Sequence, residues 1–119
     1  MKSIYFSFLI LASIATKAQS KIEISNVSKH LGDSVIVCSK VFGTKFLEQS
    51  ASQITFINLG AAYPNSPLTV VVLGKDRPHF PSAPEALYID KEVCASGVIK
   101  LNRERYEIVI TKPSELIAK

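Results

Sequence analysis

Alternating apolar and polar positions predict a β-strand over residues 33–41, DSVIVCSKV, which opens at Gly32. Successive side chains of a strand point to opposite faces. The pattern therefore predicts one apolar face and one mixed face. The residues of these two faces are Val35, Val37 and Val41 on one side and Ile36, Cys38 and Lys40 on the other.

Four more strands are expected downstream, at about residues 53–59, 68–73, 91–101 and 105–111. Residues 42–52 are a polar connector that contains Gly43 and links the first two strands like a hairpin. The segment 75–87, KDRPHFPSAPEAL, contains three prolines. It can hold only a short helix after Pro84, because proline is tolerated in the first helical turn and not inside a helix. A tight turn at Asn102-Arg103 precedes the last strand.

The order of these elements predicts the fold class. Five short strands without a long helix favour an all-β protein, a five-stranded Greek-key barrel of the OB (oligonucleotide/oligosaccharide-binding) type. The short helix or irregular insert falls between strands three and four. A β-sandwich is the competing class, but it normally has about seven strands.

The N-terminus reads as a secretory signal peptide, residues 1–18. Lys2 precedes an apolar run at 4–14, and small residues follow before a predicted cut after Ala18. The alternative is a buried N-terminal strand or helix. Residues 19–31 are then an N-terminal arm or short strand, and 32–119 form the OB-fold domain. We therefore expect a periplasmic or secreted protein with no membrane span after the signal is removed.

Removal of the leader changes the charge. The chain has 14 basic and 10 acidic residues, a net charge of +4. Without Lys2 and Lys17 the count is 12 basic against 10 acidic residues, which leaves +2. A charge this low is weak electrostatic evidence for binding polyanions.

The two cysteines, Cys38 and Cys94, suggest one disulfide in an exported chain. Each lies on the polar-bearing face of its strand. The first and fourth strands of an OB barrel are neighbours, so the two thiols can meet across them. Closing a loop of this length would stabilise the fold by ~4 kcal/mol in the chain-entropy description.

Several short segments together carry a resemblance to a known family. They are Gly32-Asp33 with the following Val-Ile-Val-Cys and Lys40-Val41, residues 55–60 (TFINLG) with Tyr63-Pro64-Asn65, Val93-Cys94, Gly97-Val98-Ile99, and Thr111-Lys112-Pro113-Ser114. The pattern resembles exported bacterial OB-fold domains of the nucleic-acid-binding kind, some of which are appended to secreted nucleases of the micrococcal type. The most specific stretch is TFINLGAAYPN, residues 55–65. Because no nuclease module is present, the resemblance implies an accessory domain.

The resemblance implies a ligand face on strands two and three and on the loop between them. Single-stranded DNA or RNA is the expected ligand, with a separately encoded nuclease or another periplasmic protein as a further partner. Aromatic platforms and a basic track are what such binding needs. The candidate residues are Phe56, Asn58 and Tyr63, with Lys75, Arg77, Lys100, Arg103 and Arg105 as phosphate contacts.

Each candidate also has a purely structural interpretation. Phe56 is more often a core residue than a platform, and Tyr63 can simply cap the barrel end. Asn58 can satisfy its own turn, and basic residues on strand edges usually face solvent. A protein-binding, small-ligand-binding or structural periplasmic domain is therefore the second hypothesis.

The sequence predicts neither catalysis nor a bound metal or cofactor. It contains no HExxH or GxSxG motif and no carboxylate pair at a useful spacing. Four residues are candidates for a metal or a Cys–His nucleophile: His30, His79, Cys38 and Cys94. Their spacing matches no compact zinc signature, and a disulfide explains the two thiols better. We expect a binding module that is not an enzyme.

Overall fold

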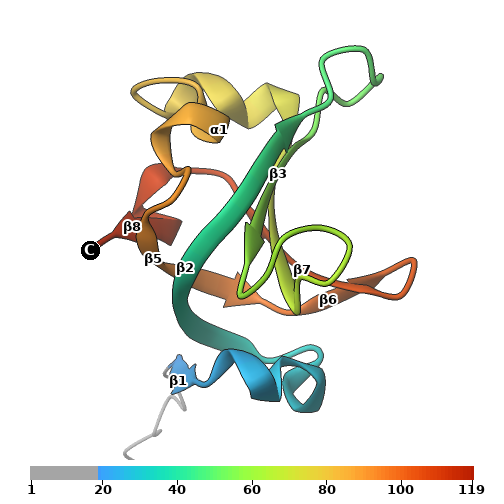
Figure 1. Cartoon of the computed structure of the whole chain (residues 1–119), viewed down its shortest axis with the longest axis vertical. Helices are drawn as coiled ribbons and strands as arrows, with labels where there is room; N and C mark the ends of the chain where they lie inside the picture. Colours follow the sequence, from blue (N-terminus) through green and yellow to red (C-terminus); the bar gives the residue numbers. More distant parts are fainter. Residues whose placement is uncertain (1–18) are drawn as a thin grey trace, which may run out of the picture.

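The computed structural model describes residues 19–119, so the predicted signal peptide lies outside the described residues. The chain is mostly β (Figure 1). In chain order the elements are β1 (Ser20–Ile22), η1 (Ile24–His30), β2 (Ser34–Phe46), β3 (Thr55–Leu59), β4 (Leu68–Val72), η2 (Gly74–His79), α1 (Pro84–Leu87), β5 (Glu92–Val98), β6 (Lys100–Asn102), β7 (Arg105–Ile110), η3 (Pro113–Glu115) and β8 (Leu116–Ala118), where η marks a 3-10 helix. All five predicted strands are present, and the expected short helix begins at Pro84.

The strands follow the order β6-β7-β4-β3-β2-β5-β8, and β1 pairs with β2 off this path. Neighbours are antiparallel except for the β4–β7 and β1–β2 pairs, which are parallel. The prediction of a closed five-stranded barrel is wrong, because the described chain has eight strands and the ladder is open.

The structure has eight strands where the sequence predicts five, for two reasons. Predicted strand four divides at Ile99, which is buried: β5 before it pairs with β2, and β6 after it pairs with β7. β5 and β6, which are separated by β2, β3, β4 and β7 along the path, are thus consecutive in the chain. The strands β1 and β8 have three residues each, too few for an alternation to be visible.

The first strand is longer than predicted. β2 continues to Phe46, and its pairing with β3 shifts between Val41 and Gly43, so Phe42 forms a β-bulge. The extra residue reverses the parity of the strand. Thr44 then lies opposite the buried Ile57 of β3, and residues 43–46 of the predicted polar connector pair with β3 instead.

The core lies between the inward faces of the strands. The predicted apolar face of the first strand is confirmed: Val35, Val37 and Val41 are buried, as are Val93 and Ala95 of β5. The same core contains Val27 of η1, so the N-terminal segment packs on the domain. Other core residues are Ile57, Leu59, Leu68, Val70, Val72, Phe80, Tyr88, Ile99, Ile108, Ile110 and Leu116.

The predicted disulfide is confirmed. Cys38 of β2 and Cys94 of β5 are register partners, and their sulfur atoms are bonded. Both cysteines are half-buried and alternate with inward-facing neighbours, so the bond lies on the outer side of the sheet.

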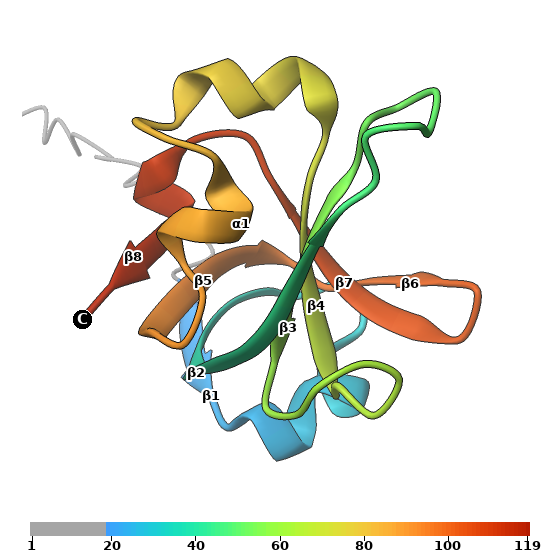
Figure 2. The same cartoon turned by 45° about the horizontal axis from the view of Figure 1, so that its top comes forward.

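Two groups of elements lie on opposite sides of the molecule. The β6–β7 hairpin and the loop between β3 and β4 lie on the side away from β8 and α1 (Figures 1 and 2). Among the described residues, no helix combines the length and the apolar character that crossing a membrane requires.

Candidate functional site

The outer face of β3 carries two of the predicted ligand residues, Phe56 and Asn58. They alternate with Thr55, Ile57 and Leu59, which are fully buried. Cross-strand partners in a sheet project from the same face. The outer face is therefore continued by Lys45 and Gly43 of β2 and by Val71 and Thr69 of β4, which pair with Phe56 and Asn58 respectively.

Arg105 covers the Phe56 ring. Its guanidinium carbon lies 4.5 Å from the ring centroid, within the range of a cation–π contact. Its Nε lies 3.1 Å from Oε2 of Glu107, two residues along β7. Glu107 is buried, and its Oε1 accepts a hydrogen bond of 3.4 Å from Nδ2 of Asn102. Arg105 thus lies between the Glu107 carboxylate, with which it forms an ion pair, and the Phe56 ring.

The loop between β3 and β4 places Tyr63 beside this face. Gly60 has a φ of +84°, a conformation that favours glycine. A Cβ at this position would lie 2.7 Å from Cγ of Pro67 and 2.8 Å from Cδ1 of Ile24, so the loop is closely packed at its base. At its tip the Tyr63–Pro64 peptide is cis, and Tyr63 is 72% exposed. The loop therefore projects an aromatic ring into solvent from a packed base.

Three adjoining hollows, with volumes of about 360, 420 and 320 Å³, meet at Arg105, which lines all of them. The first two share Phe56, and the first and third share Tyr63. We call this continuous depression the Phe56 groove. Lys45 lines it on the β2 side, and Arg103 lines it on the side of the β6–β7 turn.

Asn58 lies at the floor of the groove and is only 5% exposed. Its Oδ1 accepts hydrogen bonds from Thr69 Oγ1 at 3.0 Å and from Ser66 Oγ at 3.3 Å. Thr69 is fully buried, so its hydroxyl hydrogen needs an acceptor inside the protein, and Asn58 Oδ1 supplies it. These two hydroxyl groups fix the orientation of the amide.

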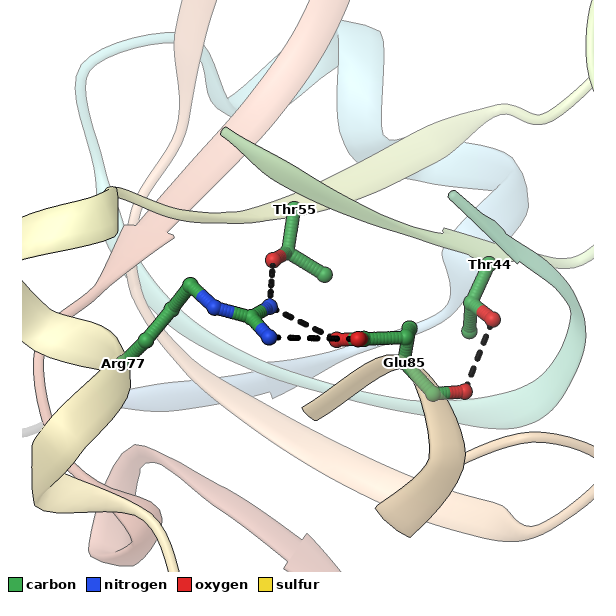
Figure 3. A network of polar contacts seen from close by, with 4 residues as sticks. All are labelled: Thr44, Thr55, Arg77 and Glu85. Atoms are coloured by element: carbon green, nitrogen blue, oxygen red, sulfur yellow. Dashed lines mark hydrogen bonds and ion pairs between the residues drawn. The ribbon is translucent and has the colours of Figure 1, made fainter. Parts of the chain in front are cut away.

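Arg77 lies outside the groove in a network of its own (Figure 3). Its two terminal nitrogens donate to the carboxylate of Glu85 at 2.6 and 3.1 Å, and one of them also donates to Thr55 Oγ1. Its guanidinium carbon lies 3.6 Å from the centroid of Phe46. The hydrogen bonds from Arg77 lower the pKa of Glu85 below its ordinary value. The Glu85 carbonyl accepts from Thr44 Oγ1 at 2.8 Å, so this network joins η2, α1, β2 and β3.

The structure brings together five of the eight predicted ligand residues in the groove: Phe56, Asn58, Tyr63, Arg103 and Arg105. Lys100 lies on β6 opposite Glu107, at the edge of the same face. Lys75 is exposed on η2 and lines a separate shallow hollow. Arg77 is tied to Glu85.

Neither Lys45 nor Glu107 is named as a groove residue from the sequence. Lys45 was assigned to a connector, because the bulge at Phe42 interrupts the alternation that would have marked it as a strand residue. Glu107 sits in an alternating strand, but its contact with Arg105 depends on the fold. A polar residue between apolar neighbours in a predicted strand was the available signal.

The two histidines are engaged locally. His30 Nδ1 lies 3.1 Å from Oδ2 of Asp33, and His79 Nδ1 lies 2.8 Å from the carbonyl oxygen of Thr111. Within residues 19–119, no three or more His, Cys, Asp or Glu side chains form a group that could hold a metal ion.

Comparison with known proteins gives a likeness of fold. No family model and no curated protein matches the chain. A solved structure assigned as an aspartyl-tRNA synthetase from Leishmania major Friedlin matches with a TM-score of 0.52 and 12% sequence identity. The match covers 91% of this chain but 22% of that protein, so the chain spans about a fifth of the length of the synthetase it matches. At this identity the similarity concerns the fold alone.

Proposed function

We propose that the chain is an exported, non-catalytic module of OB type that binds single-stranded nucleic acid along the Phe56 groove. The observation that carries the proposal is the cation–π contact between Phe56 and Arg105 in a groove that Lys45 and Arg103 also line. Bases stack on aromatic rings and on guanidinium planes, and lysine and arginine pair with the phosphates between them. Tyr63 offers a second ring at one end of the groove.

The fold supports the same proposal. The five strands predicted from the sequence correspond to β2, β3, β4, β5 and β7. They pair as the OB layout predicts: β2 with β3, β3 with β4, β2 with β5, and β4 with β7 in parallel. OB domains bind oligonucleotides on the face of their second and third strands, which correspond to β3 and β4 here. The structural neighbour is named for a tRNA. The Cys38–Cys94 disulfide supports export, because such bonds persist in oxidising compartments.

A second function is favoured by the acidic residues of the groove. Glu107 and Glu104 line it together with the basic residues, and the charge without the leader is only +2. A protein or small ligand with mixed polar groups would also fit these side chains. The periplasmic binding or structural domain therefore stands as the alternative.

A salt-dependent titration separates the two functions. Protein comprising residues 19–119 is titrated against labelled oligo(dT) and oligo(U) of about 12 nucleotides, a length within the range that OB domains cover. Measurements at about 50 and about 200 mM salt should show binding that weakens steeply, because phosphate contacts release counterions. Lack of binding at low salt, or binding without salt dependence, would contradict the proposal.

A matched pair of lysine variants locates the interface. Lys45→Ala should reduce the slope of log K against log salt by about one, as expected for one lost phosphate contact. Lys21→Ala removes the same charge from exposed β1, away from the groove, and should leave the slope unchanged. Equal effects of the two substitutions would show that only the net charge matters.

A further inference from the structure

The amide of Asn58 has one end occupied and one end free. Its Oδ1 is bound by the hydroxyl groups of Ser66 and Thr69. No side chain or backbone atom among residues 19–119 accepts a hydrogen bond from its Nδ2. The buried side-chain atoms without a hydrogen-bond partner are Asp76 Oδ2 and the ion-paired Arg105 Nε and Glu107 Oε2. Because Asn58 Nδ2 is not among them, it must reach solvent.

The solvent that this group reaches lies in the hollow of about 360 Å³ between Phe56 and Tyr63. Asn58 lines this hollow, whereas Ser66 and Thr69, which hold its oxygen, do not. The Nδ2 group is therefore the part of the amide that faces the ligand. It can only donate hydrogen bonds.

The charged groups of this hollow are donors as well. Its charged side chains are Lys45 and Arg105, and no carboxylate lines it. Lysine and arginine side chains have no acceptor. The hollow is also lined by two hydroxyl residues: Thr44, whose hydrogen is donated to the Glu85 carbonyl, and Tyr63, whose hydroxyl can donate or accept. A base entering the hollow therefore meets the amide donor of Asn58 and the two cationic donors beside Phe56.

We propose that this hollow selects bases with a carbonyl oxygen at position 4 of a pyrimidine or position 6 of a purine, namely thymine, uracil and guanine, over cytosine and adenine, which carry an amino group there, with Asn58 as the residue that determines specificity. Thymine has an acceptor, O4, at the position where cytosine has the N4 amino donor. The Asn58 Nδ2 donor can pair with O4 of thymine, whereas the N4 amino group of cytosine would face it as another donor. This inference rests on the proposed function, because it assumes that the ligand is a nucleic acid.

The first test compares oligo(dT) with oligo(dC) of equal length at one salt concentration. Both are pyrimidine strands with the same phosphates, so the comparison isolates the base edge. A slightly alkaline pH keeps cytosine neutral. We expect the wild-type protein to bind oligo(dT) roughly tenfold more tightly, the effect of one well-placed base contact.

Asn58→Asp is the decisive variant. Its carboxylate can keep the two hydroxyl donors on one oxygen and present the other oxygen, now an acceptor, to the hollow. The variant should lose affinity for both strands through repulsion of the phosphates, but its preference should turn toward oligo(dC). Binding to oligo(U) and oligo(C) should follow the same order.

A second variant guards against a folding defect in the first. Ser66→Ala with Thr69→Val removes both donors, so the Asn58 amide can rotate by 180° and present either end. The ratio of the affinities for oligo(dT) and oligo(dC) should fall to about one, while stacking on Phe56 persists. Circular dichroism and a melting curve confirm that each variant is folded.

The outcomes separate the inference from the proposed function. Equal binding of oligo(dT) and oligo(dC) by the wild-type protein would overturn the role of Asn58 and leave nucleic-acid binding intact. An unchanged preference for oligo(dT) over oligo(dC) in both folded variants would also overturn the role of Asn58 without affecting nucleic-acid binding. Absence of binding to every oligonucleotide would overturn the proposed function and this inference with it.

Discussion

The guanidinium of Arg105 lies 4.5 Å from the centre of the Phe56 ring, although the two residues belong to strands separated by β4. Glu107 contacts the Nε edge of the same guanidinium at 3.1 Å. The contact makes a composite surface that is planar like an aromatic ring and carries a positive charge. Such a surface can stack with a base and attract the adjoining phosphate at the same time.

Substitution of Arg105 tests the planar shape and the positive charge of its guanidinium separately. Arg105→Lys keeps the charge and loses the plane, so the Kd for a single-stranded oligonucleotide should rise about tenfold with an unchanged salt slope. Arg105→Ala should raise the Kd further and reduce the slope by about one. Fluorescence anisotropy over a salt series measures both quantities. Wild-type affinity in Arg105→Lys would show that the guanidinium does not stack.

Tyr63→Ala should weaken oligonucleotide binding and leave the melting temperature nearly unchanged. The ring is 72% exposed, so its removal costs the fold little, whereas loss of one stacked base costs about 1–3 kcal/mol of binding. Tyr63→Phe keeps the ring and serves as the control with near wild-type affinity. A large drop in melting temperature would identify Tyr63 as a structural residue.

The disulfide is expected to supply a large share of the stability. Cys38 and Cys94 are 56 residues apart, and closing such a loop stabilises the folded state by ~4 kcal/mol in the chain-entropy description. Unfolding of the Cys38→Ser/Cys94→Ser double variant in urea should show a loss of this order. A thiol assay on unreduced, denatured protein should detect no free sulfhydryl, and two titratable thiols would contradict the bond.

The Arg77–Glu85 pair should make stability depend on pH in the acidic range. Arg77 lowers the pKa of Glu85 in the folded state below its ordinary value of 4.5. The pair therefore stabilises the fold fully above pH 4.5, and the contribution is lost as the pH falls through the lowered pKa. Urea unfolding over this range measures the loss.

Glu85→Gln is the matched control for this pH dependence. It should be less stable than the wild-type protein at neutral pH, because Arg77 loses its charged partner. Its free energy of unfolding should also vary less with pH below 4.5. Parallel curves for the two proteins through that range would contradict a lowered pKa for Glu85.

The parts of the fold that depend on local alternation were predictable from the sequence. A single buried face fixes the parity of a strand, so the predicted apolar face of Val35, Val37 and Val41 is the one that packs into the core. The same parity placed both cysteines on the outer side of neighbouring strands, where they are bonded.

The parts that depend on pairing between distant segments were not predictable. The bulge at Phe42 changes parity inside a strand, which hid Lys45 from the pattern. Arg77 and Arg105 look alike in sequence as basic residues near strand ends. The fold pairs the first with Glu85 and lays the second over Phe56. Their different surroundings come from the packing of η2, α1 and β7, to which no local signal corresponds.

The strand β2 carries both the disulfide and one wall of the groove, with the bulge at Phe42 between them. Cys38 lies before the bulge, and Lys45 lies after it. The covalent brace and the ligand-contacting positions thus occupy separate stretches of one element. Residues of the groove can therefore be randomised in a library to obtain binders for other ligands, while the half of the sheet that holds the fold together is left as it is.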